Sequence, residues 1–168
     1  MKMEIQTIIK QLNLQPHPEG GYFKETYRSQ GSISKENLTI EFSGDRNYST
    51  AIYFMLTSDT FSAFHKINQD EFWHFYKGSP IKLHMISPEG MYTNVWIGNN
   101  FEKGEVPQFV VPAQYWFAAE VIANNSYALV GCTVAPGFDF DDFVLAERIK
   151  ILSLFPEHEN IIKRLTRV

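Results

Sequence analysis

The side chains most able to do chemistry in this chain lie in residues 61–78: His65, Glu71 and His74. Phe and Trp residues surround them, and unpaired burial of an imidazole or a carboxylate is costly. The stretch consists of two β-rich runs on either side of the polar residues 68–70, a pattern that is typical of two strands joined by a turn. The residue types therefore predict a functional pocket built on two neighbouring strands.

Strand alternation decides which of these groups can face the same cavity. In residues 70–77, Glu71 shares a face with Trp73, whereas His74 points to the other side. We therefore expect His65 as a candidate base and Glu71 as a second candidate catalytic group. Glu25 would add a carboxylate if its face of the strand over residues 22–29 turns inward. Aromatic residues that could line the cavity and stack on a ring are Tyr53, Trp73, Phe75, Trp116 and Phe117.

Composition restricts the class of protein. The 168 residues are 44% hydrophobic and 20% charged, as expected for one compact domain over residues 1–168. The net charge of -4 includes no basic run, which argues against nucleic-acid binding. No apolar run reaches the roughly 18 residues of a membrane helix, and no secretion signal is evident. The lone Cys132 is expected to be a buried, inert thiol, so we expect a cytoplasmic protein.

The hydrophobic pattern predicts an all-β fold with peripheral helices. Helical spacing predicts a short helix over residues 3–13, a helical segment over 143–152 and another helix at about 157–164. Residues 30–47 are polar and suggest a surface excursion with a weak strand at 38–42. Repeated short strands with regular turns indicate a sandwich or barrel, and they are expected at 22–29, 49–57, 61–67, 70–77, 80–87, 91–98, 107–111, 114–122 and 126–135.

With these elements placed, the chain resembles the cupin superfamily. In the first cupin motif, His65, Glu71 and Gly78 match, whereas Ile67 stands where a second histidine is expected. The second motif, P-x-G-x-x-H, falls on P-A-Q-Y-W-F at residues 112–117, where Gln114 replaces the glycine and Phe117 the histidine. The resemblance implies a jelly-roll β-sandwich whose open end holds a small ligand.

Three stretches are similar to one branch of small, single-domain, largely uncharacterised cupins that are typically dimeric. They are H-P-E-G-G-Y-F-K-E-T-Y-R-S, F-H-K-I-N-Q-D-E-F-W-H-F-Y-K-G and V-P-A-Q-Y-W-F-A-A-E. A homodimer is also expected because F-W-H-F-Y is aromatic on both faces of its strand, so something must cover the second face. We interpret His17 and Glu19 as shaping the Pro-Gly-Gly turn, and His84 as a surface or interface residue.

The replaced histidines bear on metal binding. A catalytic metal site needs about three protein ligands, and this chain keeps only two of the motif's set. We therefore expect no metal and no other cofactor.

Three functions remain open. The first is a metal-independent isomerase or epimerase acting on a sugar or sugar nucleotide, by analogy with sugar-nucleotide 3,5-epimerases, which share the cupin fold and use a histidine base. An anionic substrate would need cations at the mouth, for which Arg28 and Lys24 are candidates. The second is a non-catalytic module that binds a small ligand, and the third, less favoured, is a metal-dependent cupin enzyme.

Overall fold

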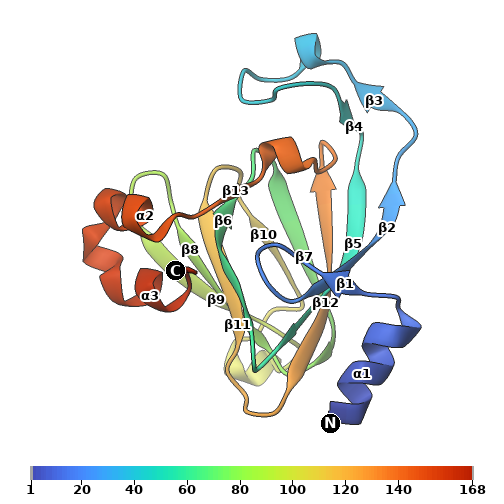
Figure 1. Ribbon diagram of the computed structural model, residues 1–168, viewed down its shortest axis with the longest axis vertical. Coiled ribbons are helices and arrows are strands. Elements are labelled where there is room, and N and C mark those ends of the chain that lie inside the picture. Colours follow the sequence, from blue (N-terminus) through green and yellow to red (C-terminus); the bar gives the residue numbers. More distant parts are fainter. Residues whose placement is uncertain (1, 168) are drawn as a thin grey trace.

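A computed structural model describes residues 2–167, and two antiparallel sheets face each other in it (Figure 1). The six-stranded sheet has the order β1 (Gln15–Pro16), β2 (Tyr22–Arg28), β5 (Thr50–Thr57), β12 (Tyr127–Ala135), β7 (Asp70–Gly78) and β10 (Gln108–Val111). The five-stranded sheet has the order β13 (Val144–Leu145), β6 (Phe61–Lys66), β11 (Trp116–Val121), β8 (Ile81–Ile86) and β9 (Tyr92–Ile97). This arrangement confirms the predicted jelly-roll fold.

The main core lies between the two sheets because each strand turns alternate apolar side chains inward. In β7, Glu71 and Trp73 are buried, whereas Phe72 and Tyr76 between and beyond them are 37% and 51% exposed. Trp73 packs with inward residues of the facing sheet, among them Leu83. The period of two therefore sets both the packing of the core and the direction of the chemically active side chains.

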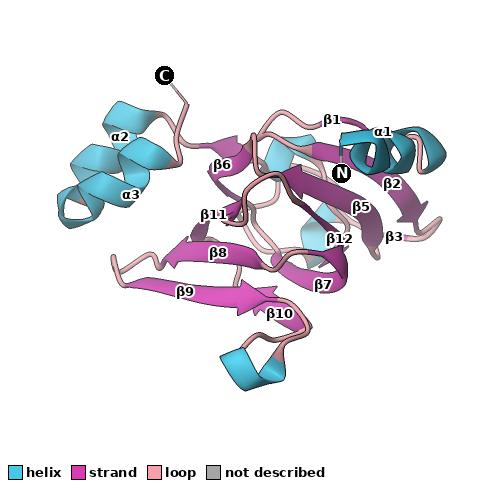
Figure 2. Cartoon of the chain, turned by 90° about the horizontal axis from the view of Figure 1, so that it is seen from below, coloured by secondary structure: helices cyan, strands magenta, loops and turns pink. Residues whose placement is uncertain are grey.

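Helices cover the outer face of each sheet. Helix α1 (Lys2–Gln11) packs Ile5, Ile8 and Ile9 against the six-stranded sheet around Met55. Helices α2 (Arg148–Leu154) and α3 (Glu159–Arg164) lie on the opposite side of the molecule, against the five-stranded sheet (Figure 2). Short 3-10 turns are η1 (Lys35–Asn37), η2 (Phe101–Lys103), η3 (Phe140–Asp142) and η4 (Pro156–His158). Within residues 2–167, every helix is too short or too polar to cross a membrane.

The eight strands predicted from residue 49 to residue 135 are confirmed to within two residues at each end. The weak strand predicted at 38–42 is wrong: those residues form turns, and the excursion is instead closed by β3 (Ser32–Ile33) pairing with β4 (Arg46–Asn47). The helical segment predicted from residue 143 begins only at Arg148. Residues 144–145 instead pair with β6 and form β13. This pairing gives their backbone N–H and C=O groups hydrogen-bond partners, which an isolated helical turn would leave without partners.

Candidate functional site

A cavity of about 150 Å³ lies between the sheets at the end of the barrel where β2 ends and β5 begins. Its apolar wall includes the aromatic residues Phe23, Phe54, Trp73, Phe138, Phe140 and Phe143. The polar groups that reach it are His17, Glu19, Glu25, Arg28, His65 and Glu71. An apolar enclosure with a few convergent polar groups is the usual form of a small-molecule site.

His65 projects from β6 and is 2% exposed. Its Nδ1 lies 2.7 Å from the carbonyl oxygen of Ala63, which can only accept, so Nδ1 carries a hydrogen. Its Nε2 lies 3.1 Å from Glu19 Oε2, and its ring packs at 4.0 Å between centroids against Phe117. The backbone therefore fixes the orientation of the imidazole, and Nε2 is the atom left for chemistry.

Glu19 is the buried partner of His65, at 6% exposure. The turn that carries it is joined to β6 by the Ala63 N–H, which donates to the Glu19 carbonyl at 2.9 Å. Ser62 donates its hydroxyl to Glu19 Oε1 at 2.7 Å, and His17 Nδ1 lies 3.4 Å from Oε2. The sequence interpretation of His17 and Glu19 as turn-shaping residues is thus incomplete, since both side chains line the cavity.

Burial shifts the pKa of both groups of this pair. It raises the pKa of Glu19 and lowers the pKa of both His65 and His17, because the charged form of each group loses its hydration. Both directions disfavour the charged form of each group, so burial weakens the ion pair between Glu19 and the Nε2 of His65.

Glu71 faces the same cavity from β7 and is 9% exposed. Burial raises its pKa to about 7, with the charge of Glu19 acting in the same direction and His65 opposing it. Beside it, burial raises the pKa of the Cys132 thiol well above its usual range, so Cys132 stays protonated. The indole of Trp73 lines the cavity, and its buried N–H acts on the neighbouring Glu71 carboxyl group, whose pKa it lowers against the effect of burial. Glu71 can thus both accept and donate a proton near neutral pH.

The mouth of the cavity carries Glu25, Arg28 and Asp139. Simple alternation predicts Glu25 and Arg28 on opposite faces of β2, but the register with β5 shifts between Glu25 and Tyr27, and this bulge brings Arg28 to the cavity side. Arg28 binds both carboxylate oxygens of Glu25, at 2.8 and 3.1 Å, and donates to the Phe138 carbonyl at 3.1 Å. Its charge is therefore already paired, and Lys24 lies outside the cavity wall.

The structure brings four of the predicted site residues to the cavity: His65, Glu71, Glu25 and Trp73. Phe117 lies behind His65 in the core, where it supports the ring. Three placements need correction, because Tyr53, Phe75 and Trp116 are not part of the cavity wall.

Alternation and position along the strands explain these three corrections. In β5, Ile52 and Phe54 face the cavity, so Tyr53 points outward and meets Tyr76 at 6.2 Å between ring centroids. Phe75 is on the inner face of β7 but farther along the barrel, near Pro107. Trp116 is on the outer face of the five-stranded sheet, under Lys66.

Sequence reasoning missed the cavity wall formed by residues 138–143, F-D-F-D-D-F, because it assigned no structure to residues 138–142 and placed Phe143 in a helical segment. Phe138, Phe140 and Phe143 all line the cavity. The one available signal was three phenylalanines in six residues directly after Pro136-Gly137, a composition more suited to covering an apolar space than to a solvated loop.

The donor set does not fit a catalytic metal of the cupin type. Ile67 lines the cavity and Phe117 packs on His65, so two of the motif's ligand positions carry side chains without donor atoms. Across residues 2–167, no three His, Cys, Asp or Glu side chains are arranged to hold a metal ion. Glu19, which faces His65, is moreover engaged with Ser62.

Comparison with known proteins agrees with the fold. Residues 6–146 match the family described as Cupin superfamily (DUF985), and the chain therefore belongs to the cupin superfamily and to this branch of it. An uncharacterised protein of Saccharomyces cerevisiae, YML079W, is 35% identical over 147 residues, which cover 82% of this chain and 73% of the yeast protein.

Solved structures divide into close and distant neighbours. A hypothetical protein from Leishmania major superposes with a TM-score of 0.88 at 34% identity, covering 97% of this chain and 98% of its own. Protein SO0799 from Shewanella oneidensis gives 0.87 at 36% identity, with 96% of each chain covered. Oxalate decarboxylase from Bacillus subtilis gives 0.54 at 13% identity over 89% of this chain and 36% of its own, a likeness of fold alone.

Proposed function

We propose that this cupin binds a small, uncharged carbonyl compound of sugar size and catalyses proton transfer within it, as a metal-independent isomerase or epimerase. One observation carries the proposal: Glu71, whose pKa is about 7, faces the same small cavity as the His65–Glu19 pair. A general acid–base catalyst works best when its pKa is close to the operating pH. Two proton-holding groups around one cavity meet the minimum requirement of an enolisation.

In the proposed step, ionised Glu71 removes a proton from the carbon beside the carbonyl group. The electron pair of the broken C–H bond moves to the carbonyl oxygen, which takes a proton from the His65–Glu19 pair. Protonated Glu71 then gives its proton to carbon while a hydroxyl group of the enol returns a proton to the pair, so the reaction needs no redox partner. This assigns the first base to Glu71 and the supporting acid to the His65–Glu19 pair, in place of the sequence expectation of His65 as base.

The size and charge of the cavity favour a simple sugar over a nucleotide-linked one. Cavities of about 150 Å³ admit a molecule as large as one six-membered ring. Arg28 is the cation of the mouth, and it is paired with Glu25 while Asp139 adds a further carboxylate. A diphosphate would meet net negative charge there.

Deuterium incorporation tests the proposal directly. The chain is incubated in deuterated water with a panel of unphosphorylated aldoses and ketoses, and exchange at carbon is followed by NMR. We expect incorporation whose rate rises as Glu71 ionises around pH 7 and falls at least about 100-fold in Glu71→Gln, as for loss of a catalytic base. Glu36→Gln, at an exposed carboxylate, serves as the matched control.

The alternative of a non-catalytic binding module predicts a different result. A sugar that raises the melting temperature without any exchange, equally in the parent chain and in Glu71→Gln, would replace the enzymatic proposal by simple binding. An absence of both exchange and stabilisation across the panel would remove sugars as the ligand class.

We also propose that the chain acts as a cytoplasmic homodimer. Phe72 and Tyr76 are exposed on the outer face of the six-stranded sheet, beyond the part that α1 covers. A second copy would bury these rings, which water otherwise contacts. Sedimentation equilibrium at micromolar concentration should give twice the monomer mass, and Tyr76→Lys should shift the equilibrium toward the monomer.

A further inference from the structure

Three aromatic residues of the cavity wall, Phe138, Phe140 and Phe143, belong to one crossing segment, residues 136–143, which we name the strap. The strap leaves the end of β12 in the six-stranded sheet and reaches β13 beside β6 in the five-stranded sheet, so it passes over the open end of the barrel (Figure 1). Its backbone is tied at the first end, where Gly137 N–H donates to Asn47 at 2.7 Å and Phe138 N–H to Thr50 Oγ1 at 2.9 Å.

The rings of the strap form a single packed group. Phe138 and Phe140 lie 5.1 Å apart between centroids, and Phe140 and Phe143 lie 6.0 Å apart, in both cases edge to face. Phe140 stacks on His17 at 5.9 Å, and Phe143 lies 5.3 Å from His65. The position of the strap therefore determines how closely both imidazoles of the site are covered.

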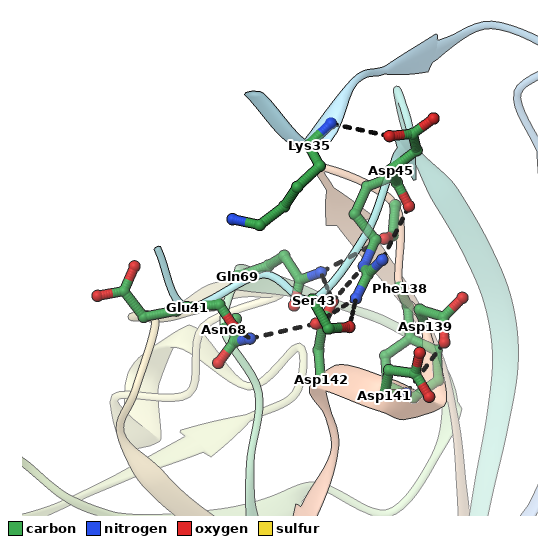
Figure 3. A network of polar contacts seen from close by, with 12 residues as sticks. Lys35, Glu41, Ser43, Asp45, Asn68, Gln69, Phe138, Asp139, Asp141 and Asp142 are labelled. Carbon is green, nitrogen blue, oxygen red and sulfur yellow. Dashed lines mark hydrogen bonds and ion pairs between the residues drawn. The ribbon is translucent and has the colours of Figure 1, made fainter. Parts of the chain in front are cut away.

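The carboxylate of Asp142 holds the strap in place through hydrogen bonds on the side that faces away from the cavity. Asp142 is 2% exposed and, together with its neighbours, forms the polar network of Figure 3. Its two oxygens accept from Arg46 Nε at 2.7 Å and a terminal nitrogen of Arg46 at 2.6 Å, and also from Gln69 Nε2 at 2.7 Å and Asn68 Nδ2 at 3.2 Å. The Arg46 contact is the bidentate fork that fixes a carboxylate in both position and plane.

The partners of Asp142 connect the strap to two other parts of the chain. Arg46 is 4% exposed and belongs to β4, at the end of the polar excursion of residues 30–47. Asn68 and Gln69 form the turn between β6 and β7, the two strands that carry His65 and Glu71. The network thus links the strap to the same turn that joins the strands of His65 and Glu71.

We propose that Asp142 and Arg46 are positioning residues that hold the strap closed and so determine which molecules can enter the cavity. Neither side chain lines the cavity, and each acts through the three phenylalanines. Because the Asp142 network connects to the 30–47 excursion, movement of that excursion is transmitted to the wall. The inference concerns access alone and holds whatever reaction the cavity supports.

The first measurement is hydrogen exchange by mass spectrometry and NMR on the whole chain. In Asp142→Asn we expect the amides of residues 137–143 to exchange about tenfold faster, because the strap opens locally, while amides of β8 keep their rates. Asp141→Asn is the matched control, since it removes the same charge one residue away at an exposed side chain. The control should leave both regions unchanged.

The second measurement reports access to the cavity itself. Trp73 lines the cavity, and with Trp96→Phe and Trp116→Phe it becomes the single tryptophan of the chain. Acrylamide, a small uncharged quencher, should reach Trp73 poorly in this background and about fivefold more readily once Asp142→Asn is added. Arg46→Lys keeps the charge but loses the fork, and should give an intermediate increase.

The outcomes separate positioning from simple loss of stability. Faster exchange in the strap and in β8 together would show general destabilisation and overturn the proposal. So would a folded Asp142→Asn chain with unchanged quenching of Trp73. If Asp142→Asn does not fold, Arg46→Lys decides by the same two measurements: an unchanged strap and an unchanged quenching constant would again refute the positioning role.

Discussion

Two buried histidines, one on each side of the five-stranded sheet, show how the same residue pair acquires different properties. His65, 2% exposed, meets Glu19 at 3.1 Å inside the barrel, and His84, 1% exposed, meets Glu120 at 3.0 Å beneath the terminal helices. In distance and burial the two imidazoles are equivalent. The difference lies in the carboxylate, because Glu19 is more deeply buried than Glu120 and has different partners.

Glu120 has a guanidinium partner and Glu19 has a hydroxyl partner. Burial acts to raise the pKa of Glu120, but the hydrogen bonds of His84 and of Arg164 from α3 outweigh it, so that its pKa is lowered. At Glu19, burial outweighs the charge of His17 and the hydrogen bond from Ser62, and its pKa is raised. Arg164 thus favours the charged form of Glu120 and attaches α3, whereas burial disfavours the charged form of Glu19.

The largest expected difference concerns removal of each imidazole. His84→Ala should lower the free energy of unfolding by about 3 kcal/mol, because it opens a void and leaves Tyr92 and Glu120 without their shared partner. His65→Ala should cost less than about 1 kcal/mol, because its ring borders an existing cavity and pocket residues are seldom optimised for stability. Urea unfolding of both variants measures the difference. Equal losses would mean that His65 is as structural as His84.

The next effect is a gain of stability on removal of the charge from Glu71. The pKa of Glu71 is 4.5 in the unfolded chain and about 7 in the folded chain. Between these two pH values the folded chain keeps a proton on Glu71 that the unfolded chain releases, so stability falls as the pH rises from 4.5 to about 7. Glu71→Gln should therefore be more stable than the parent chain by about 2–3 kcal/mol at pH 8 and not at pH 4. Thermal melts across this range would show a flatter profile for the variant; parallel profiles would contradict the raised pKa.

The smallest effect, of opposite sign, belongs to Glu120. Its lowered pKa contributes stability that is present above the ordinary value of 4.5 and is lost as the pH falls through the folded value below it. Glu120→Gln should lose about 1 kcal/mol at pH 7, because Arg164 is half exposed and water screens the pair. The loss should shrink in high salt. A gain of stability, as at Glu71, would remove the distinction between the two sites.

Sequence reasoning succeeded where local periodicity and turn residues were sufficient. The strands around residues 68–70 were predicted from alternation, and this alternation placed Glu71 with Trp73 and away from His74, as the structure shows. The motif positions of Ile67 and Phe117 also indicated which donor atoms the cavity lacks. These features depend on neighbours along one or two adjacent strands, which a sequence displays directly.

It failed where a contact joins distant segments or where alternation is interrupted. His84 was interpreted as a surface or interface residue, yet α2 and α3 cover its face of the sheet, which no pattern near residue 84 reveals. The bulge in β2 brings Arg28 to the same side as Glu25, which alternation alone places on the opposite face. Glu19 reaches His65 only because the turn that carries it lies along β6. Each of these features is a property of tertiary packing rather than of the local period.

The turn at Gly20 constrains how this family of chains can diverge. Gly20 has φ of +120°, and a Cβ placed on it would lie 2.1 Å from the carbonyl oxygen of Phe61. The backbone of Gly20 lies directly against the backbone of Phe61 in β6. The separation between Glu19 and β6 therefore does not depend on the size of any packed side chain. Residues of the wall can therefore change in size while Glu19 keeps its place beside His65. Under the proposed function, substrate preference and acid–base chemistry become traits that can be inherited separately.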